Sequence, residues 1–347
     1  MKIALVSSTV LPCLPLDHPD NGYNGLEQIV WSLASGLARR GHDVLLIAPG
    51  GTIAPPGVIL HETTRGESEE AAYSGYWPKL LGCDVIIDHS WQKWSYILKI
   101  EGRLTAPILG VLHAPANTMY QRSPPVLLPC LVAISNDQAT HVSELWGVPA
   151  RVAYNGIDLG FYHAERTANA SRSDRYLFLA RISTIKGPHL AVDLARQLRI
   201  PLDIVGDDRI TGEPRLAQRI RALSQHNIAY HGGVSRARTV TFFATTHALL
   251  HPAFAFREPF GLSIVEAQAC GAPVIVSDHG ALRETVVHGE TGFVCKTIDE
   301  MRELVRADAA RSITSDACRD NAARFSIAAM VKRYEDLCTE ALDTGGW

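Results

Sequence analysis

Short apolar runs alternate with longer amphipathic segments along most of the chain. The apolar runs are rich in Val, Ile and Leu and are bounded by Gly, Pro or Asp, which is typical of strands that are buried on both faces. The amphipathic segments place apolar residues at helical spacing. This alternation predicts an α/β fold made of doubly wound parallel sheets with helices on both faces.

The pattern runs through the first half of the chain and then starts again. In the first half we expect helices at Glu27–Arg39 and Asp137–Trp146, each followed closely by a glycine. The strands expected there are Lys2–Val6, Asp43–Ala48, Val58–Glu62, Asp84–His89, Pro107–His113, Leu131–Ser135 and Arg151–Tyr154. In the second half we expect strands at Tyr176–Ala180, Leu202–Val205, Ile228–His231, Ala248–His251 and Pro273–Ser277, with helices at Pro188–Leu198, Arg215–Ser224 and Gly261–Ala269.

A polar, aperiodic segment separates the two halves. Residues 155–175, NGIDLGFYHAERTANASRSDR, have the composition of a linker. The sequence therefore predicts one lobe at residues 1–157 and a second at residues 158–325, with a C-terminal helix within residues 326–347 that packs back onto the first lobe. Ligands of such sheets bind at the carboxyl ends of the strands, so we expect the site in a cleft between the lobes.

Composition and charge narrow the class of protein. A hydrophobic content of 46% with 20% charged residues indicates a folded globular chain. The net charge of −3 offers no basic surface for nucleic acid. The seven cysteines include no C-x-x-C pair, which favours a reducing compartment. No apolar run is long enough to cross a bilayer, and the start lacks a signal-peptide pattern, so we expect a cytoplasmic protein without stable membrane insertion.

Two carboxylates bracket the start of a predicted helix in HPAFAFREPFGLSIVEAQACG. Glu258 comes just before Pro259, and Glu266 falls in the second turn of the helix that begins near Gly261. A helix start presents unpaired N–H groups to an anion such as phosphate, and carboxylates beside it suit hydroxyl groups. A sugar nucleotide carries both, although by itself the segment also fits a helix with acidic residues near its N-terminus.

Two further features lie at predicted strand ends. Arg181 follows a strand in LARISTIKGP, and Lys186 comes five residues later, so the two cations can clamp a diphosphate. The alternative is an ordinary loop with solvated cations. Gly206 ends the strand in DIVGDD, where a glycine lets the backbone approach a ligand closely.

Together these segments resemble glycosyltransferase family 4, whose members are retaining enzymes with a GT-B fold of two Rossmann-like lobes. The resemblance covers nearly the whole chain. The matching segments are NGLEQIVWSLASGLARRGHDV, VLHAP, VAISNDQ, VAYNGID, LARISTIKG, LDIVGDD and EPFGLSIVEAQACGAPVIVSDHGALRETVVHGETGF. The last segment is the most specific of them.

The resemblance implies a role for each matching position in the second lobe. Glu258 matches the first glutamate of the family's E-x7-E motif, which contacts the donor sugar near its reacting face. Glu266 matches the second glutamate, which holds the ribose hydroxyls. Arg181 and Lys186 match the pair that binds the diphosphate and stabilises it as it leaves. Backbone groups that would meet the diphosphate or the sugar belong to Phe260, Gly261 and Leu262.

Positions in the first lobe also match. Gly25 matches a glycine-rich loop that closes over the donor phosphates, and His113 matches a histidine near the donor sugar. The chain departs from the family pattern in having Asn24-Gly25 where a Gly-Gly pair is usual, and Ala253 where a serine often follows the proline. Neither departure removes a charged group.

The resemblance thus implies a retaining hexosyltransferase. It would move a hexose, expected to be glucose, from a UDP- or GDP-sugar to a hydroxyl of a small-molecule, glycan or lipid-linked acceptor. We expect no cofactor and no metal, because the chain contains no Asp-x-Asp and the fixed cations can take the place of a metal. His247 and His251 are expected to be structural, since their spacing on a strand does not suit zinc. The alternatives are an epimerase or hydrolase of a UDP-sugar and a non-catalytic nucleotide-sugar binder.

Acceptor binding is expected to involve the first lobe. Trp91 and Trp94 would share a helical face, where they either stack on an acceptor ring or pack in the core. The loop around Met119, Tyr120 and Arg122 is a second candidate for this part of the site.

Overall fold

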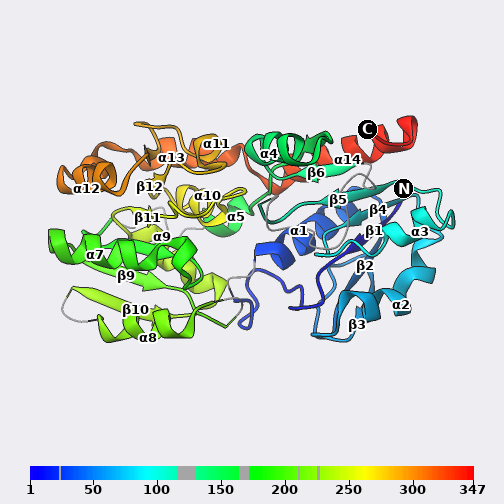
Figure 1. Cartoon of the computed structure of the whole chain (residues 1–347), viewed down its shortest axis with the longest axis horizontal. Coiled ribbons are helices and arrows are strands. Elements are labelled where there is room, and N and C mark those ends of the chain that lie inside the picture. Colours follow the sequence, from blue (N-terminus) through cyan, green and yellow to red (C-terminus); the bar gives the residue numbers. More distant parts are fainter. Residues whose placement is uncertain (23–24, 116–129, 164–171, 210–211, 225–226) are drawn as a thin grey trace. The chain divides into compact units, whose positions relative to one another are not determined.

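The backbone divides into two compact units. In this computed structural model, residues 1–22, 25–115, 130–163, 172–209, 212–224 and 227–347 of the 347 are described. The first unit comprises Met1–Leu16, Asn24–Gly156 and Ile327–Trp347, and the second comprises Asp17–Tyr23 and Ile157–Ser326 (Figure 1). The short segment Asp17–Tyr23 therefore joins the second unit, which the sequence pattern did not indicate.

The first unit is built on a seven-stranded parallel sheet in the order β3-β2-β1-β4-β5-β6-β7. Strand β1, the third in this order, pairs Ile3 with Val44 on one side and with Val85 on the other. Four of its five residues are buried, as expected of a strand that is covered on both faces. The strands are β1 (Lys2–Val6), β2 (Asp43–Pro49), β3 (Val58–Thr63), β4 (Val85–Asp88), β5 (Ile108–Val111), β6 (Leu131–Ala133) and β7 (Ala150–Val152).

Helices cover this sheet (Figure 1). They are α1 (Gly25–Arg39), α2 (Glu69–Leu80), α3 (Tyr96–Ile100), α4 (Asn136–Trp146) and α14 (Ile327–Thr344). Side chains of α2 and α3 form one core cluster with residues of β1, β2 and β4. Helix α14 packs against α1. Glu335 of α14 accepts from Arg40 at 2.7 Å and contacts His42 at 2.8 Å, which fastens the C-terminal helix to the end of α1.

The second unit holds a six-stranded parallel sheet in the order β10-β9-β8-β11-β12-β13. Its strands are β8 (Tyr176–Leu179), β9 (Leu202–Val205), β10 (Ile228–Gly232), β11 (Leu249–His251), β12 (Val274–Ser277) and β13 (Gly292–Cys295). Its helices are α5 (Leu159–Tyr162), α7 (Pro188–Leu198), α8 (Pro214–Ala222), α9 (Arg236–Thr245), α10 (Leu262–Ala269), α11 (Leu282–Thr285), α12 (Ile298–Arg306) and α13 (Ser315–Ala323), with 3-10 turns at Thr184–Lys186 and Ala309–Ser312.

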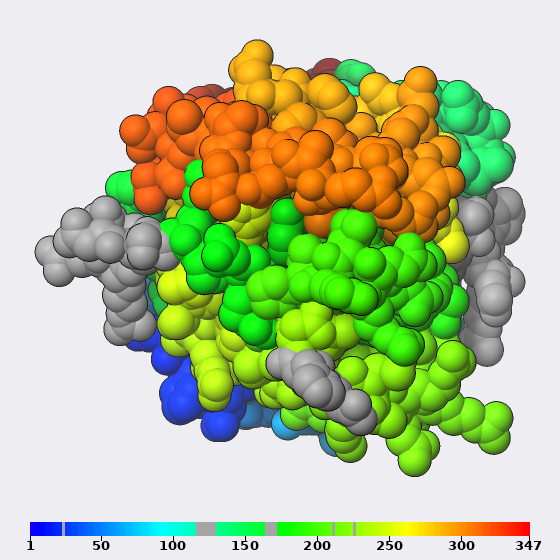
Figure 2. Space-filling model, turned by 90° about the vertical axis from the view of Figure 1, so that its left-hand side faces the viewer, coloured from blue at the N-terminus to red at the C-terminus, as the bar shows by residue number. Residues whose placement is uncertain are grey.

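Apolar side chains of α7, α8 and α12 pack against one face of this sheet. The cluster includes Phe178, Ile204 and Ile275 from three different strands. Helices α7 and α12 lie side by side on the surface (Figure 2), where Arg302 donates to Gln197 at 3.0 Å. Elsewhere in this unit, helix α10 packs against both α9 and α13. The sheet is thus a layer between helices.

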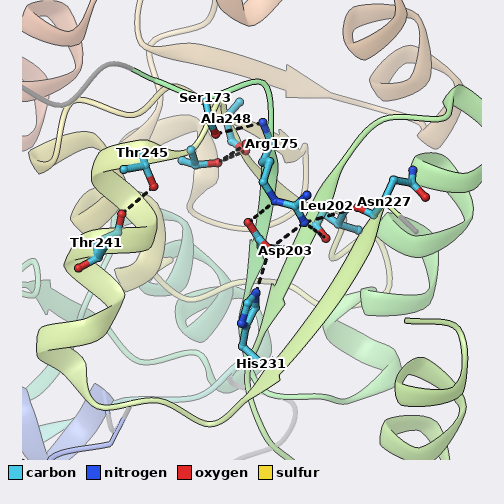
Figure 3. A network of polar contacts seen from close by, with 10 residues as sticks. Ser173, Arg175, Leu202, Asp203, Asn227, His231, Thr241, Thr245 and Ala248 are labelled. Carbon is cyan, nitrogen blue, oxygen red and sulfur yellow. Dashed lines mark hydrogen bonds and ion pairs between the residues drawn. The ribbon is translucent and has the colours of Figure 1, made fainter. Parts of the chain in front are cut away.

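A polar network joins the amino ends of β8 and β9 to β10 (Figure 3). Arg175 donates from Nε and Nη2 to the two carboxylate oxygens of Asp203, at 2.8 and 2.9 Å. His231 contacts the same carboxylate at 2.8 Å. Burial raises the pKa of Asp203, but the hydrogen bonds from Arg175 and His231 outweigh it, so the net pKa lies below the usual value. This network fixes the register of three strands at the end opposite the predicted site.

The architecture confirms the predicted α/β class with doubly wound parallel sheets. Every predicted strand is present, with ends that differ by a few residues. The prediction that residues 155–175 form a linker is wrong for the described part, because Leu159–Tyr162 forms α5 and Tyr162 is buried. Besides α5, the helices that the sequence pattern did not predict include α2, α9, α11, α12 and α13, and strand β13 was not predicted either. Among the described residues, no helix combines the length and the apolar character that a membrane crossing requires.

Candidate active site

Three of the predicted donor residues, Arg181, Lys186 and Glu258, lie after the carboxyl ends of two paired strands of the second unit. Strands β8 and β11 are neighbours in the sheet. Arg181 follows β8, and Lys186 ends the 3-10 turn after it. His251 ends β11, and the loop after it leads to Glu258. Because carboxyl ends of parallel strands meet at one edge of a sheet, residues more than 70 apart in sequence come into contact here.

Glu258 lies at the centre of this cluster. Its Oε2 accepts from Nζ of Lys186 at 2.6 Å and contacts Nε2 of His251 at 3.1 Å. The Lys186 ammonium also lies 4.0 Å from the centre of the Phe256 ring, within range of a cation–π contact. Glu258 is only 8% exposed and His251 is 2% exposed. A lysine and a histidine thus share one oxygen of a nearly buried carboxylate.

The charges of this cluster follow from its geometry. Burial raises the pKa of Glu258, but the positive charge of Lys186 and the hydrogen bond from His251 outweigh burial and bring the pKa to about 2. Glu258 is therefore ionised at neutral pH. Burial lowers the pKa of the Arg181 guanidinium, and the charge of Glu258 opposes that shift. The cluster combines fixed cations with one fixed anion.

The backbone around Glu258 is held by a second segment of the chain. The Glu258 N–H donates to the carbonyl of His279 at 3.3 Å, and its own carbonyl accepts from the Ala281 N–H at 2.8 Å. Between these two bonds lies Gly280, with a φ of +83°. A Cβ at Gly280 would lie 2.4 Å from the Glu258 carbonyl oxygen, so this close approach requires glycine.

Helix α10 begins directly after Glu258. Gly261 caps it in a left-handed conformation, and the first N–H groups of any helix have no acceptor within the helix itself. Leu262 is the first helical residue. Phe260 is 2% exposed, and its ring packs edge-to-face on Phe325 with 5.5 Å between the ring centres. Contact of its backbone with a ligand stays a prediction. The start of α10 supplies the expected N–H groups and a dipole end that favours an anion.

Gly206 lies at the end of β9, as predicted. Its φ is +148°, and a Cβ there would lie 1.9 Å from the carbonyl oxygen of Ala180. Glycine at this position therefore lets the backbone after β9 approach the backbone after β8 closely. Contact of Gly206 with a ligand stays a prediction.

Glu266 lies inside the second unit and is 1% exposed. Its Oε1 accepts from Nη1 of Arg236 at 2.6 Å and from the Tyr162 hydroxyl at 2.7 Å. Arg236 Nη1 also lies 3.0 Å from the Tyr162 oxygen. Burial raises the pKa of Tyr162 well above its usual value, so it remains a phenol. Sequence reasoning missed Arg236, Tyr162 and the contact of His251, because none of them lies in a recognisable spacing.

The remaining predicted residues belong to the first unit. Gly25 is the first residue of α1. His113 follows β5, and its Nε2 lies 2.8 Å from Nδ1 of the buried His89, with the two rings stacked 5.1 Å apart. Burial, together with the nearby charge of Lys93, lowers the pKa of His113 to about 3, so its ring is neutral at neutral pH. Proximity of Gly25 and His113 to the donor stays a prediction.

The tryptophans of the expected acceptor region do not share a helical face, because α3 begins only at Tyr96. Trp94 stacks on Tyr73 at 6.2 Å, whereas Trp91 is 42% exposed. The prediction of a shared face is therefore wrong. The loop residues Met119, Tyr120 and Arg122 lie outside the described residues.

The two histidines whose spacing suggests a zinc site have separate partners. His247 contacts Asp308 at 2.6 Å, and His251 contacts Glu258. Within the described part of the chain, no three His, Cys, Asp or Glu residues form a group that could hold a metal ion.

Two family profiles match consecutive parts of the chain. Residues 23–161 match the profile described as Glycosyltransferase Family 4, and residues 163–325 match the one described as Glycosyl transferases group 1. The chain belongs to glycosyltransferase family 4. As a family 4 glycosyltransferase it is an enzyme, and the segment that carries Glu258, Lys186 and Glu266 falls within the second match.

Curated relatives of this glycosyltransferase include D-inositol 3-phosphate glycosyltransferases and glycogen synthases. A D-inositol 3-phosphate glycosyltransferase from Xylanimonas cellulosilytica is 24% identical, with 87% of this chain and 86% of the relative covered. A glycogen synthase from Mycobacterium tuberculosis is also 24% identical, with 82% and 81% covered. In both cases the similarity covers more than four-fifths of each chain.

Solved glycosyltransferase structures share the fold. AviGT4, a glycosyltransferase involved in avilamycin A biosynthesis, has a TM-score of 0.75 at 23% identity, with 100% and 99% of the two chains covered. Anabaena Alr3699/HepE in complex with UDP and glucose has a TM-score of 0.74 at 19% identity, with 98% and 99% covered. These likenesses confirm the predicted GT-B class.

Proposed function

We propose that this glycosyltransferase moves a hexose, with glucose expected, from a nucleoside diphosphate sugar to an acceptor hydroxyl with retention of configuration and without a metal. The observation that carries the proposal is the cluster of Lys186, Glu258 and His251 at the edge of the second sheet, beside Arg181 and the start of α10. It offers positive charge for a diphosphate and an ionised carboxylate for sugar hydroxyls. The relative Alr3699/HepE was solved with UDP-glucose, which supports UDP as the nucleotide.

The cations act on the leaving group. As the bond between the anomeric carbon and the phosphate oxygen breaks, its electron pair goes to the diphosphate, and negative charge grows there. Lys186, Arg181 and the first N–H groups of α10 stabilise that charge more strongly than the smaller charge of the ground state. This difference accelerates the reaction.

The carboxylate acts on the sugar. Glu258 is ionised, so it accepts hydrogen bonds from hexose hydroxyls close to the ring that gains positive charge. Its negative charge also favours a cationic ring in the transition state. The acceptor oxygen then bonds to the anomeric carbon on the face that the phosphate leaves, and the proton of the acceptor hydroxyl departs with the nucleoside diphosphate.

Two side-chain cations supply the charge that a divalent metal provides in other sugar-nucleotide enzymes. Lys186 and Arg181 come from one loop after β8, so their spacing is set by the fold and not by ligand binding. No cofactor takes part in a transfer of this kind. The acceptor is a small molecule or a glycan with a free hydroxyl, in keeping with the named relatives.

A donor panel tests this function. UDP-glucose, UDP-galactose, GDP-mannose and GDP-glucose are each added to the full chain, first alone in a thermal-shift assay and then with candidate polyol and glycan acceptors. We expect one donor to raise the melting temperature and to give an acceptor-dependent product that survives excess chelator. Loss of turnover in chelator would contradict metal independence. A new sugar formed without acceptor would instead support an epimerase or hydrolase.

A further inference from the structure

A buried triad in the second unit links three helices. Tyr162 comes from α5, Arg236 is the first residue of α9, and Glu266 lies in α10. Their polar atoms form a triangle with sides of 2.6, 2.7 and 3.0 Å. Arg236 is 0% exposed and Glu266 is 1% exposed. A complete ion pair is therefore enclosed among helices.

Such a pair is costly to enclose unless its charges are well satisfied. Glu266 lies between Val265 and Ala267, both fully buried, on a helix that is otherwise mostly apolar. Packing alone would be served as well by apolar side chains of similar size. We therefore infer that these three polar groups serve ligand binding by the Glu266 carboxylate as well as packing.

Two hydrogen bonds fix the backbone of Arg236. Its N–H donates to the carbonyl of Asn21 at 2.9 Å, and its carbonyl accepts from the Thr239 hydroxyl at 2.6 Å. The guanidinium therefore extends from a fixed helix start. A fixed cation holds a carboxylate in one orientation better than a mobile one does.

Tyr162 is held as firmly. Helix α5 is a single turn that Asp158 caps by accepting from the Phe161 N–H at 3.0 Å. The carbonyl of Tyr162 accepts from the Cys270 thiol at 3.3 Å, next to the end of α10. This short helix thus places one hydroxyl on Glu266.

Both donors of the triad end on the same oxygen, Oε1. We propose that Arg236 and Tyr162 are positioning residues that fix the rotation of Glu266, so that this carboxylate receives the ribose hydroxyls of the donor nucleotide. This inference rests on the proposed function and adds two residues that determine how the ribose is recognised. Neither Arg236 nor Tyr162 touches the donor itself.

The test compares two nucleotides that differ only at the ribose. Affinities for UDP and for 2′,3′-dideoxyuridine diphosphate are measured by calorimetry. If the donor panel shows that the enzyme uses a GDP-sugar, GDP and 2′,3′-dideoxyguanosine diphosphate are compared in the same way. Hydrogen bonds to a charged group are the strong ones, so we expect the wild type to prefer UDP by on the order of tenfold or more.

The variants are Tyr162→Phe, Arg236→Gln and Glu266→Gln, with Arg238→Gln as the control, because Arg238 is an exposed arginine of the same helix. We expect Tyr162→Phe to reduce the preference several-fold and Arg236→Gln and Glu266→Gln to bring it close to one. Affinity for the dideoxy nucleotide should change little, and Arg238→Gln should retain the full preference.

The outcomes separate the two proposals. If the wild type binds neither UDP nor GDP, the proposed function fails. If it binds one of them without any preference for the ribose hydroxyls, the role of Glu266 fails, and this inference fails with it. A third outcome would show that the triad is merely structural. The wild type would prefer UDP to the dideoxy nucleotide, and Tyr162→Phe and Arg236→Gln, shown to be folded by circular dichroism, would lower the affinity for both nucleotides equally and keep that preference. This outcome overturns the inference. Should Arg236→Gln fail to fold, Tyr162→Phe, which removes a single oxygen, decides the matter.

Discussion

Nζ of Lys186 lies 2.6 Å from Oε2 of Glu258, although the sequence assigns the two residues to different parts of the donor. Each of the two charges satisfies the other in a nearly buried place. A bound diphosphate would also contact the Lys186 ammonium, and sugar hydroxyls would also donate to the Glu258 carboxylate. The ion pair therefore holds both charged groups in fixed positions within the proposed site.

Lys186→Ala should abolish most of the activity. The substitution removes a cation from the leaving group, and we expect turnover to fall by about 100-fold or more. It also removes the charge that contributes most to lowering the pKa of Glu258, so that pKa should rise. Steady-state kinetics with the selected donor measure the first effect. Lys332→Ala, on the exposed side of α14, serves as the control. Equal turnover in Lys186→Ala and the wild type would contradict the mechanism.

Glu258 should contribute to stability in a pH-dependent way. Its pKa is lowered from 4.5 to about 2 in the folded chain, so its contribution is complete above about pH 4.5 and is lost as the pH falls towards 2. Unfolding by urea, followed at several pH values from about 6 down to about 3, should show a steeper loss of stability in the wild type than in Glu258→Gln. Parallel curves would show that Lys186 and His251 do not hold the carboxylate in its ionised form.

Gly280→Ala should impair the enzyme although residue 280 carries no side chain. The new methyl group would meet the Glu258 backbone at 2.4 Å, so we expect the loop to shift and turnover to drop at least about tenfold. Gly289→Ala is a matched control, because Gly289 has a similar φ of +82° and an added Cβ there would meet no atom of the described residues within 4 Å. Both variants should lose about 1 kcal/mol of stability from the left-handed backbone. Similar activities in the two variants would argue against a tight fit at Gly280.

His113 should remain neutral throughout the physiological range. Its pKa is lowered to about 3, mainly by burial, so its ring should not gain a proton between about pH 8 and about pH 5. Because the folded pKa lies below the ordinary value of about 6.5, protonation of the unfolded chain costs stability as the pH falls from that value towards 3. Heteronuclear NMR of selectively labelled histidine, assigned with a His113→Asn variant, follows the titration. A midpoint near the ordinary value would contradict the enclosed pairing with His89.

The sequence pattern identified the sheets because buried parallel strands are continuous apolar runs. Strand β9 and helix α7 have the predicted ends, and the loop cations after β8 lie where the motif places them. Helix α12 also had a signal, since Thr297 and Glu300 at its start have the spacing of a capping box, and the Thr297 hydroxyl accepts from the Glu300 N–H. Helix α9 was harder to find, because RARTVTFFAT is rich in β-branched and aromatic residues that suit strands as well.

The site was predictable where a motif names the residues and unpredictable where the fold alone joins them. Local sequence names Glu258 and Lys186 as candidates, but their contact depends on the pairing of β8 with β11. The spacing of His251 predicts only a structural role, and yet this histidine contacts the same carboxylate. Tyr162 lies in a segment whose composition predicts a linker, since a single-turn helix has too few residues to show a period.

A crystal structure of the enzyme with bound UDP tests the central claim most directly. The account predicts that the diphosphate lies at the start of α10, with phosphate oxygens about 3 Å from Nζ of Lys186 and from the Arg181 guanidinium. A diphosphate bound elsewhere in the chain, with Lys186 still paired only to Glu258, would contradict it.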